Sequence, residues 1–183
     1  NLSNTPFRLY KQNQHEGGIS TPLIVHWPRV ISKGGNVTHA MGHITDLMAT
    51  CLEVAGAKYP KANSRGQKVL PMRGSSLAPV FRGGTREPTD PVFFHFSSNR
   101  AVRSGKWKLS WTGKGPWELY NMDKDRTELV DLSDKFASRA REMAASWDRW
   151  FKETNGGKFK GGGGNKKNRK NNKKDRKQKK PAE

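Results

Sequence analysis

Residues 100–111 read RAVRSGKWKLSW, a stretch that predicts a β-hairpin closed by a turn at Ser104-Gly105. In its second half, large apolar residues alternate with small or charged ones: Lys106, Trp107, Lys108, Leu109, Ser110 and Trp111. Such alternation is typical of a strand with one buried face and one face in water. Lys108 is therefore predicted to point into solvent.

Two further stretches, 92–96 and 117–121, flank the hairpin and have the composition of strands, so we expect about four antiparallel strands. A helix is predicted next, with Ser133 as its N-cap. Its apolar residues recur at helical spacing: Phe136, Ala140, Met143, Ala144, Trp147 and Phe151. A single apolar stripe of this kind predicts that the helix packs on the sheet.

A different pattern precedes the sheet. Residues 21–27 (TPLIVHW) form a short apolar run closed by Pro28, which predicts a buried strand. A helix is predicted from about 43 to 55, ending at Gly56, with these apolar positions on one stripe: Ile44, Leu47, Met48, Cys51 and Val54. Because Cys51 lies on that stripe, we expect it in the core rather than as a nucleophile. A strand followed by a helix is typical of an α/β fold.

Charge is concentrated at the end of the chain. The 183 residues carry 35 Lys and Arg against 16 Asp and Glu, and residues 161–183 alone hold ten basic and two acidic side chains. No apolar residue falls between Lys160 and Pro181, so residues 156–183 are predicted to be a disordered Gly- and Lys-rich tail. Such a tail either binds polyanions weakly or only improves solubility, and both readings stay open.

Composition also excludes several classes of protein. A single Cys cannot form an intrachain disulfide or a zinc site of paired thiolates. No apolar run approaches the roughly 18–20 residues that cross a bilayer.

The stretch 5–22 is the most informative for chemistry, because it is polar, rich in donors and leads into the predicted strand. Lys11 and Arg8 are candidates to contact an anionic group, and His15 is a candidate for proton exchange near neutral pH. Gly17 and Gly18 would permit close approach of a ligand or unusual backbone angles. The alternative is a solvated loop with incidental charges.

Two weaker candidates concern metals. His39 and His43 have the four-residue spacing of a helical metal pair, but Gly42 lies between them. Residues 123–128 (DKDRTE) begin like a calcium loop, yet Glu128 stands where an EF-hand requires Gly, so a polar turn is predicted instead.

Several motifs resemble one family when taken in order. Residues 6–11 (PFRLYK), followed by 16–19 (EGGI) and 21–24 (TPLI), resemble the lysine-plus-EGG signature of type I sulfatases. These are the formylglycine-dependent arylsulfatases of the alkaline-phosphatase-like superfamily. The resemblance continues through 43–50 (HITDLMAT), with Ala49 in place of the usual proline, and through three later stretches: 73–77, 100–109 and 118–121. In total it covers about residues 3–151.

The resemblance implies an architecture. It implies an α/β fold, the C-terminal part of an alkaline-phosphatase-like sulfatase domain followed by a small antiparallel sheet packed by a C-terminal helix. We expect residues 1–60 to end the catalytic α/β domain, 61–90 to be an irregular connection, 91–155 to form the sheet subdomain and 156–183 to be the tail.

The resemblance also implies an activity. The longer parent protein would hydrolyse sulfate esters, among which sulfated polysaccharides are candidate substrates, with a formylglycine nucleophile and Ca²⁺. Lys11 matches the lysine that contacts the sulfate group, and His15 beside it is a weaker substrate-binding candidate. Residues 51–55 (CLEVA) do not fit the family's nucleophile motif, so the nucleophile and calcium ligands are expected upstream of Asn1. The isolated chain is expected to be inactive.

Two alternatives accompany this interpretation. In one, the chain is a polyanion-binding module acting through residues 161–183 on a non-catalytic sulfatase-like scaffold. In the other, the parent is a phosphoester hydrolase of the same superfamily. The resemblance also implies a periplasmic or secreted location, which is typical of the family.

Overall fold

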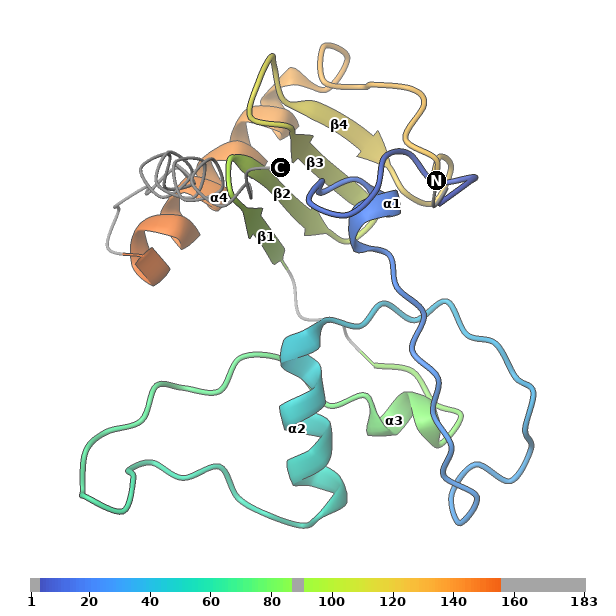
Figure 1. Cartoon of the computed structure of the whole chain (residues 1–183), viewed down its shortest axis with the longest axis vertical. Coiled ribbons are helices and arrows are strands. Elements are labelled where there is room, and N and C mark those ends of the chain that lie inside the picture. The colour runs from blue at the N-terminus through green and yellow to red at the C-terminus, as the bar shows by residue number, and fades with distance from the viewer. Residues whose placement is uncertain (1–3, 87–90, 156–183) are drawn as a thin grey trace, which may run out of the picture.

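The computed structural model describes residues 4–86 and 91–155. Along the chain the elements are α1 (Glu16–Ile19), α2 (Ile44–Val54), α3 (Ala78–Phe81), β1 (Val92–Phe96), β2 (Asn99–Ser104), β3 (Trp107–Trp111), β4 (Glu118–Asn121) and α4 (Ala137–Asn155). The sheet and α4 lie at one end and α2 with α3 at the other, and the chain after α1 runs between them (Figure 1). Within the described ranges, we find no helix with the length and hydrophobicity that crossing a bilayer requires.

The sheet is an antiparallel meander in the order β1-β2-β3-β4, which confirms the predicted strands. Gly105, at φ +52°, allows the tight turn between β2 and β3. In the register of the central strands, Val102 lies opposite Leu109, which lies opposite Leu119. These three side chains therefore share one face of the sheet.

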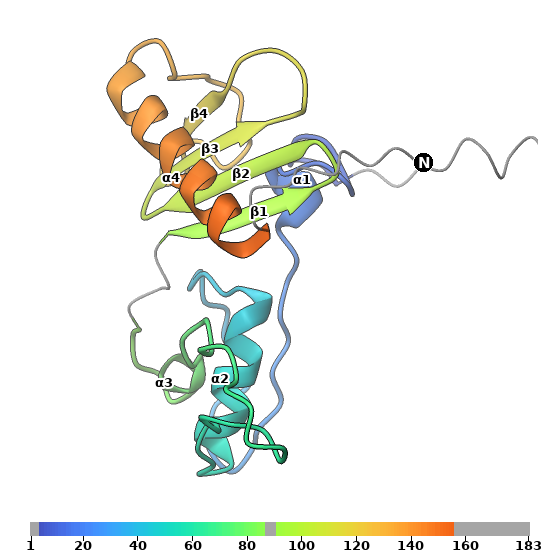
Figure 2. The ribbon, with the colours of Figure 1, turned by 90° about the vertical axis from the view of Figure 1, so that its left-hand side faces the viewer.

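Helix α4 covers that face, as its apolar stripe predicts (Figure 2). The core consists of side chains from β2, β3, β4 and α4: Val102, Leu109, Leu119, Ala140, Met143, Trp147 and Phe151. The Trp147 indole Nε1 donates a hydrogen bond of 3.0 Å to the Phe94 carbonyl oxygen, so the buried ring also satisfies its polar atom. The Arg100 guanidinium lies 4.7 Å from the centre of the same ring.

The predicted N-cap of α4 is wrong. Residues 133–136 form a turn, and the helix begins at Ala137. The turn is held by Asp131, whose Oδ1 accepts hydrogen bonds from the backbone N–H of Ser133 at 2.8 Å and of Leu119 at 2.9 Å. Asp131 thus joins β4 to the residues that lead into α4.

The prediction of a solvent-facing side for β3 is also wrong. Lys108 and Ser110 are both fully buried, because residues 4–20, here called the N-terminal segment, cover the second face of the sheet. Alternation distinguishes the two faces of a strand, but it does not say what packs on the polar one.

Helix α2 is where the sequence predicts it, yet it packs by a different face. Asp46 is buried, and its carboxylate accepts hydrogen bonds from the backbone N–H of His43 (2.8 Å) and Ser75 (2.9 Å) and from the guanidinium of Arg86 (2.8 Å). Burial alone would raise the pKa of Asp46, but these donors together lower it. Thr50 Oγ1 accepts a further hydrogen bond of 2.9 Å from the Leu77 backbone N–H.

The apolar stripe of α2 is left exposed, with Ile44 at 72% exposure. Cys51 is exposed as well, which corrects the expectation that it lies in the core. Helical spacing identified a stripe correctly, but the polar partners of Asp46 and Thr50 decided which face packs.

Residues 21–27 do not form the predicted strand. They carry no regular secondary structure, and Ile24 is 90% exposed. A strand forms only against a neighbour, and within 4–86 and 91–155 no strand pairs with these residues. The predicted irregular connection over 61–90 contains α3 and one isolated bridge between Ala62 and Lys68. The predicted tail over 156–183 lies outside the described residues.

Replacing Met143 by Ala tests the packing of α4 on the sheet. Because Met143 is buried in the core cluster, Met143→Ala is expected to lower the free energy of unfolding by about 2–5 kcal/mol. Denaturation followed by tryptophan fluorescence measures this. The neighbouring exposed Glu142 provides the control, since Glu142→Ala should change stability by less than about 0.5 kcal/mol. Equal effects of the two substitutions would contradict this account of the core.

Candidate active site

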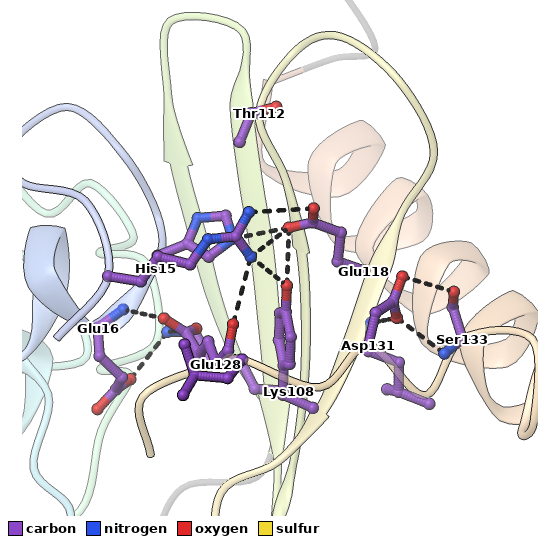
Figure 3. Close-up of polar contacts among 12 residues, drawn as sticks. His15, Glu16, Lys108, Thr112, Glu118, Glu128, Asp131 and Ser133 are labelled. Atoms are coloured by element: carbon purple, nitrogen blue, oxygen red, sulfur yellow. Dashed lines mark hydrogen bonds and ion pairs between the residues drawn. The ribbon is translucent and has the colours of Figure 1, made fainter. Parts of the chain in front are cut away.

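The second face of the sheet carries charged residues that bind the N-terminal segment (Figure 3). At its centre, the Lys108 ammonium donates a hydrogen bond of 2.8 Å to Glu16 Oε1. It also forms an ion pair of 2.8 Å with Glu128 Oε1. The other oxygen of Glu128 accepts a hydrogen bond of 2.7 Å from the Glu16 backbone N–H. We call Glu16, Lys108 and Glu128 the buried charge cluster.

Arg126 balances the charge of this cluster. Lys108 pairs with both carboxylates, and the Nη2 of Arg126 lies 3.4 Å from Glu16 Oε2. On the sheet, Lys108 lies directly opposite Arg103 of β2. Two cations facing each other across strands repel, so the carboxylate of Glu16 also offsets this repulsion. Removing one partner of a buried pair leaves an uncompensated charge, which typically costs about 3–5 kcal/mol.

The pKa of Glu16 reports the same balance. Burial alone would raise this pKa, but the charge of Lys108 and its hydrogen bond, with smaller contributions from Arg103 and Arg126, lower it overall. Glu16 is therefore ionised in the folded protein at neutral pH.

A second group of polar contacts surrounds Glu118 on β4. His15 Nε2 lies 2.8 Å from Glu118 Oε2, and the Arg8 guanidinium spans both carboxylate oxygens at 3.3 and 3.4 Å. The Tyr120 hydroxyl donates to Glu118 Oε2 at 2.9 Å and accepts from Arg8 Nη1 at 2.6 Å. One carboxylate thus has partners from two separate positions of the N-terminal segment.

These contacts change two pKa values in opposite directions. Burial would raise the pKa of Glu118, but hydrogen bonds from His15 and Tyr120 and the charge of Arg8 lower it. Burial and the neighbouring Glu118 carboxylate raise the pKa of Tyr120, which therefore stays protonated. The Tyr120 hydroxyl can then donate its hydrogen bond throughout the neutral range.

The two glycines after Glu16 allow the chain to fold closely on itself. The Gly17 backbone N–H donates a hydrogen bond of 3.0 Å to the Arg8 carbonyl. A Cβ at Gly17 would overlap the carbonyl groups of Arg8 and Leu9, and a Cβ at Gly18 would overlap that of Asn13. Glycine is required at both positions because the backbone of residues 8–13 lies directly against them.

The structure separates the predicted site residues. Lys11 is exposed, and within 4–86 and 91–155 its ammonium has no hydrogen-bond or ion-pair partner. His15 is fully buried against Glu118. Arg8, a candidate for anion contact, is instead bound to Glu118, Tyr120 and the Glu128 carbonyl. Of the three, Lys11 alone is exposed and unpaired.

Of the weaker metal candidates, His39 is exposed, and His43 and the turn over 123–128 have structural roles. The His43 side chain caps α2, with Nδ1 accepting from the Thr45 backbone N–H at 3.4 Å. In the predicted polar turn, Asp125 Oδ2 accepts from the backbone N–H of Leu129 at 2.8 Å and of Val130 at 2.9 Å. No group of three or more His, Cys, Asp or Glu side chains in the described part of the chain could hold a metal ion.

Comparison with known proteins identifies the class. The profile of the family described as "N-sulphoglucosamine sulphohydrolase, C-terminal" matches residues 7–146. The chain therefore belongs to this sulfatase family, which confirms the resemblance stated above.

Individual relatives agree. A sulfatase of Formosa agariphila is 32% identical over 146 residues, covering 71% of this chain and 26% of the relative. The N-acetylgalactosamine-6-sulfatase of Mus musculus is 35% identical over 126 residues, covering 67% and 22%. The chain thus spans about a quarter of the length of these relatives.

The crystal structure of Ps i-CgsB has a similar fold. The two share a TM-score of 0.67 and 25% sequence identity, over 81% of this chain and 32% of that one. The predicted fold class, a C-terminal portion of a sulfatase with an antiparallel sheet and a terminal helix, is confirmed.

Sequence reasoning missed the residues that support the Lys11 loop. Lys108 was assigned to a solvent-facing side by strand alternation, and Glu118 and Glu128 were not singled out for any role. No local signal marks them, because their partners lie about 90 to 112 residues away along the chain. The glycines were noted for close approach, but their partner proved to be the protein's own backbone.

Substituting Gly17 tests the close approach of the loop. Gly17→Ala is expected to displace residues 8–13, because the added methyl group would overlap two carbonyls. Hydrogen exchange should show lower protection of the Gly17 and Asn13 amides, which donate to Arg8 and Tyr10. Gly34→Ala is the matched control, since nothing lies within 4 Å of a Cβ there. Unchanged protection in Gly17→Ala would contradict the packing described.

Acid is expected to release the N-terminal segment. The folded-state pKa values of Glu16 and Glu118 lie below their ordinary 4.5. Their stabilisation is therefore present above pH 4.5 and lost as the pH falls through the folded values. The protection factor of the Gly17 amide, which corrects for the intrinsic pH dependence of exchange, should fall in that range. In Glu16→Gln it should be lower at pH 7 and vary less with pH. Parallel pH curves for the two proteins would contradict this assignment.

Proposed function

We propose that the full-length protein containing this chain is a sulfate ester hydrolase in which Lys11 contacts the sulfate group of the substrate. The observation that carries the proposal is an exposed lysine, without partners among the described residues, on a loop that β2 and β4 hold by hydrogen bonds. This loop falls within the residues that match the sulfatase family.

The chemistry suits a lysine. Breaking the S–O bond of a sulfate ester moves negative charge onto oxygen atoms, and a fixed ammonium group stabilises such charge. Lys11 has the required charge, and its ammonium pairs with no carboxylate among the described residues. His15, as the buried partner of Glu118, is assigned to holding the loop rather than to direct substrate contact.

The remaining machinery is proposed to lie elsewhere in the protein. The family resemblance implies a formylglycine nucleophile and Ca²⁺, and the described residues contain no group of three or more His, Cys, Asp or Glu that could hold a metal ion. Lys11 is accordingly the one group among residues 4–86 and 91–155 that we place at the reacting sulfate.

For the substrate, we propose a sulfated saccharide. The support is the 35% identity to a protein named for sulfated N-acetylgalactosamine. A periplasmic or secreted location, which the family resemblance implies, would suit such a substrate.

Lys11→Ala in the full-length protein is expected to lower kcat/KM by at least ~10²-fold, as loss of one preorganised electrostatic group often does. Initial rates on an aryl sulfate and on sulfated galactosamine and glucosamine saccharides measure this. Lys114→Ala, at an exposed position in the loop between β3 and β4, is the matched control and should leave kcat/KM unchanged.

Two results would contradict the proposal. One is near-parental turnover by Lys11→Ala on every sulfate ester that the parent hydrolyses. The other is hydrolysis of phosphate monoesters in clear preference to the matching sulfate monoesters, which would instead support the phosphoester alternative.

A further inference from the structure

We propose that Glu118 is a positioning residue for Lys11, because its carboxylate binds both ends of the loop that carries the lysine. The proposal deepens the function proposed above and rests on it. It concerns how a side chain on β4 determines where an exposed ammonium group is held.

The two ends of the loop converge on one carboxylate. Arg8, three residues before Lys11, reaches both oxygens of Glu118 at 3.3 and 3.4 Å. His15, four residues after Lys11, lies 2.8 Å from Oε2. Glu118 therefore closes residues 8–15 into a loop whose base is fixed to the sheet (Figure 3).

The backbone of the loop explains why fixed ends are needed. Leu9, two residues before Lys11, has a φ value of +63°, and Gln12, directly after it, has a φ value of +79°. A non-glycine residue in this region is strained and persists only where its surroundings hold it. Asn99 on β2 adds support, donating a hydrogen bond of 2.6 Å to the Gln12 carbonyl.

The carboxylate is itself held in place. The Tyr120 hydroxyl donates to Glu118 Oε2 and accepts from Arg8, so the three side chains form one connected group. The Glu118 side chain is 27% exposed and His15 is buried, so water competes little for the hydrogen bond between them. A glutamine at this position would keep the shape but lose the negative charge that Arg8 faces.

Loss of this support would move Lys11 without removing it. A misplacement of about 1 Å can cost ~10²-fold in rate. Glu118 binds the loop ends and not the exposed ammonium, so its influence on the reaction passes through the position of Lys11. That distinguishes it from a residue that acts on the substrate independently.

The test is a double-mutant cycle in the full-length protein, with an aryl sulfate and a sulfated saccharide as substrates. Glu118→Gln is expected to lower kcat/KM by ~10–10²-fold. The loss should be divided between kcat and KM in the same ratio as the loss in Lys11→Ala. In the Lys11→Ala background, Glu118→Gln should have less than about a 2-fold effect, because the group it positions is gone.

Two further variants guard against a general loss of folding. Arg8→Gln releases one end of the loop only, so it should give a smaller loss that also disappears in the Lys11→Ala background. Met143→Ala destabilises the opposite face of the same sheet and should leave kcat/KM unchanged at temperatures where the protein is folded.

The possible failures are distinguishable. If Lys11→Ala is impaired but Glu118→Gln and Arg8→Gln are not, Glu118 does not position the lysine. An undiminished effect of either variant in the Lys11→Ala background would also overturn the proposal. Full activity of Lys11→Ala would instead reject the proposed function of Lys11 itself.

Discussion

The packing of the N-terminal segment on the second face of the sheet depends on one interaction, the burial of the Lys108 ammonium between Glu16 and Glu128. A charge removed from water is tolerated only with close partners, and here one partner comes from α1 and the other from the stretch between β4 and α4. The segment carrying Glu16 is thereby fixed, and with it Gly17 and the loop of Lys11.

The two faces of the sheet follow different physical rules. The face under α4 is held by apolar contact, which accepts changes of shape as long as volume is kept. The opposite face is held by charged pairs to the N-terminal segment. Within that segment Gly17 and Gly18 lie against its own backbone carbonyl groups, and neither kind of contact tolerates much change. The loop that we propose to present Lys11 to a substrate lies on the second kind of surface, where hydrogen bonds lock the side chains that support it.

Elements whose partners are close in sequence were predictable. The strands β1 to β4 are joined by short turns, and the apolar stripe of α4 packs on the sheet that directly precedes it in the sequence. The residue pattern alone therefore indicated the meander and the helix that covers it. Prediction failed where the partner is distant. Residues 21–27 lack a neighbouring strand among the described residues, Cys51 is exposed because α2 packs through Asp46, and Asp131 rather than Ser133 holds the turn before α4.

The sequence by itself determined the secondary structure of the C-terminal part, the family and the candidate Lys11, because local periodicity and short motifs carry that information. Only the tertiary structure decided that Lys108 is buried and that His15 and Arg8 bind Glu118. It also decided that Gly17 and Gly18 allow close contact with the protein's own backbone rather than with a ligand. The physical reason is that the strength of a charge pair depends on burial and distance in space. The sequence gives neither the burial nor the distance in space of two residues that are about a hundred positions apart along the chain.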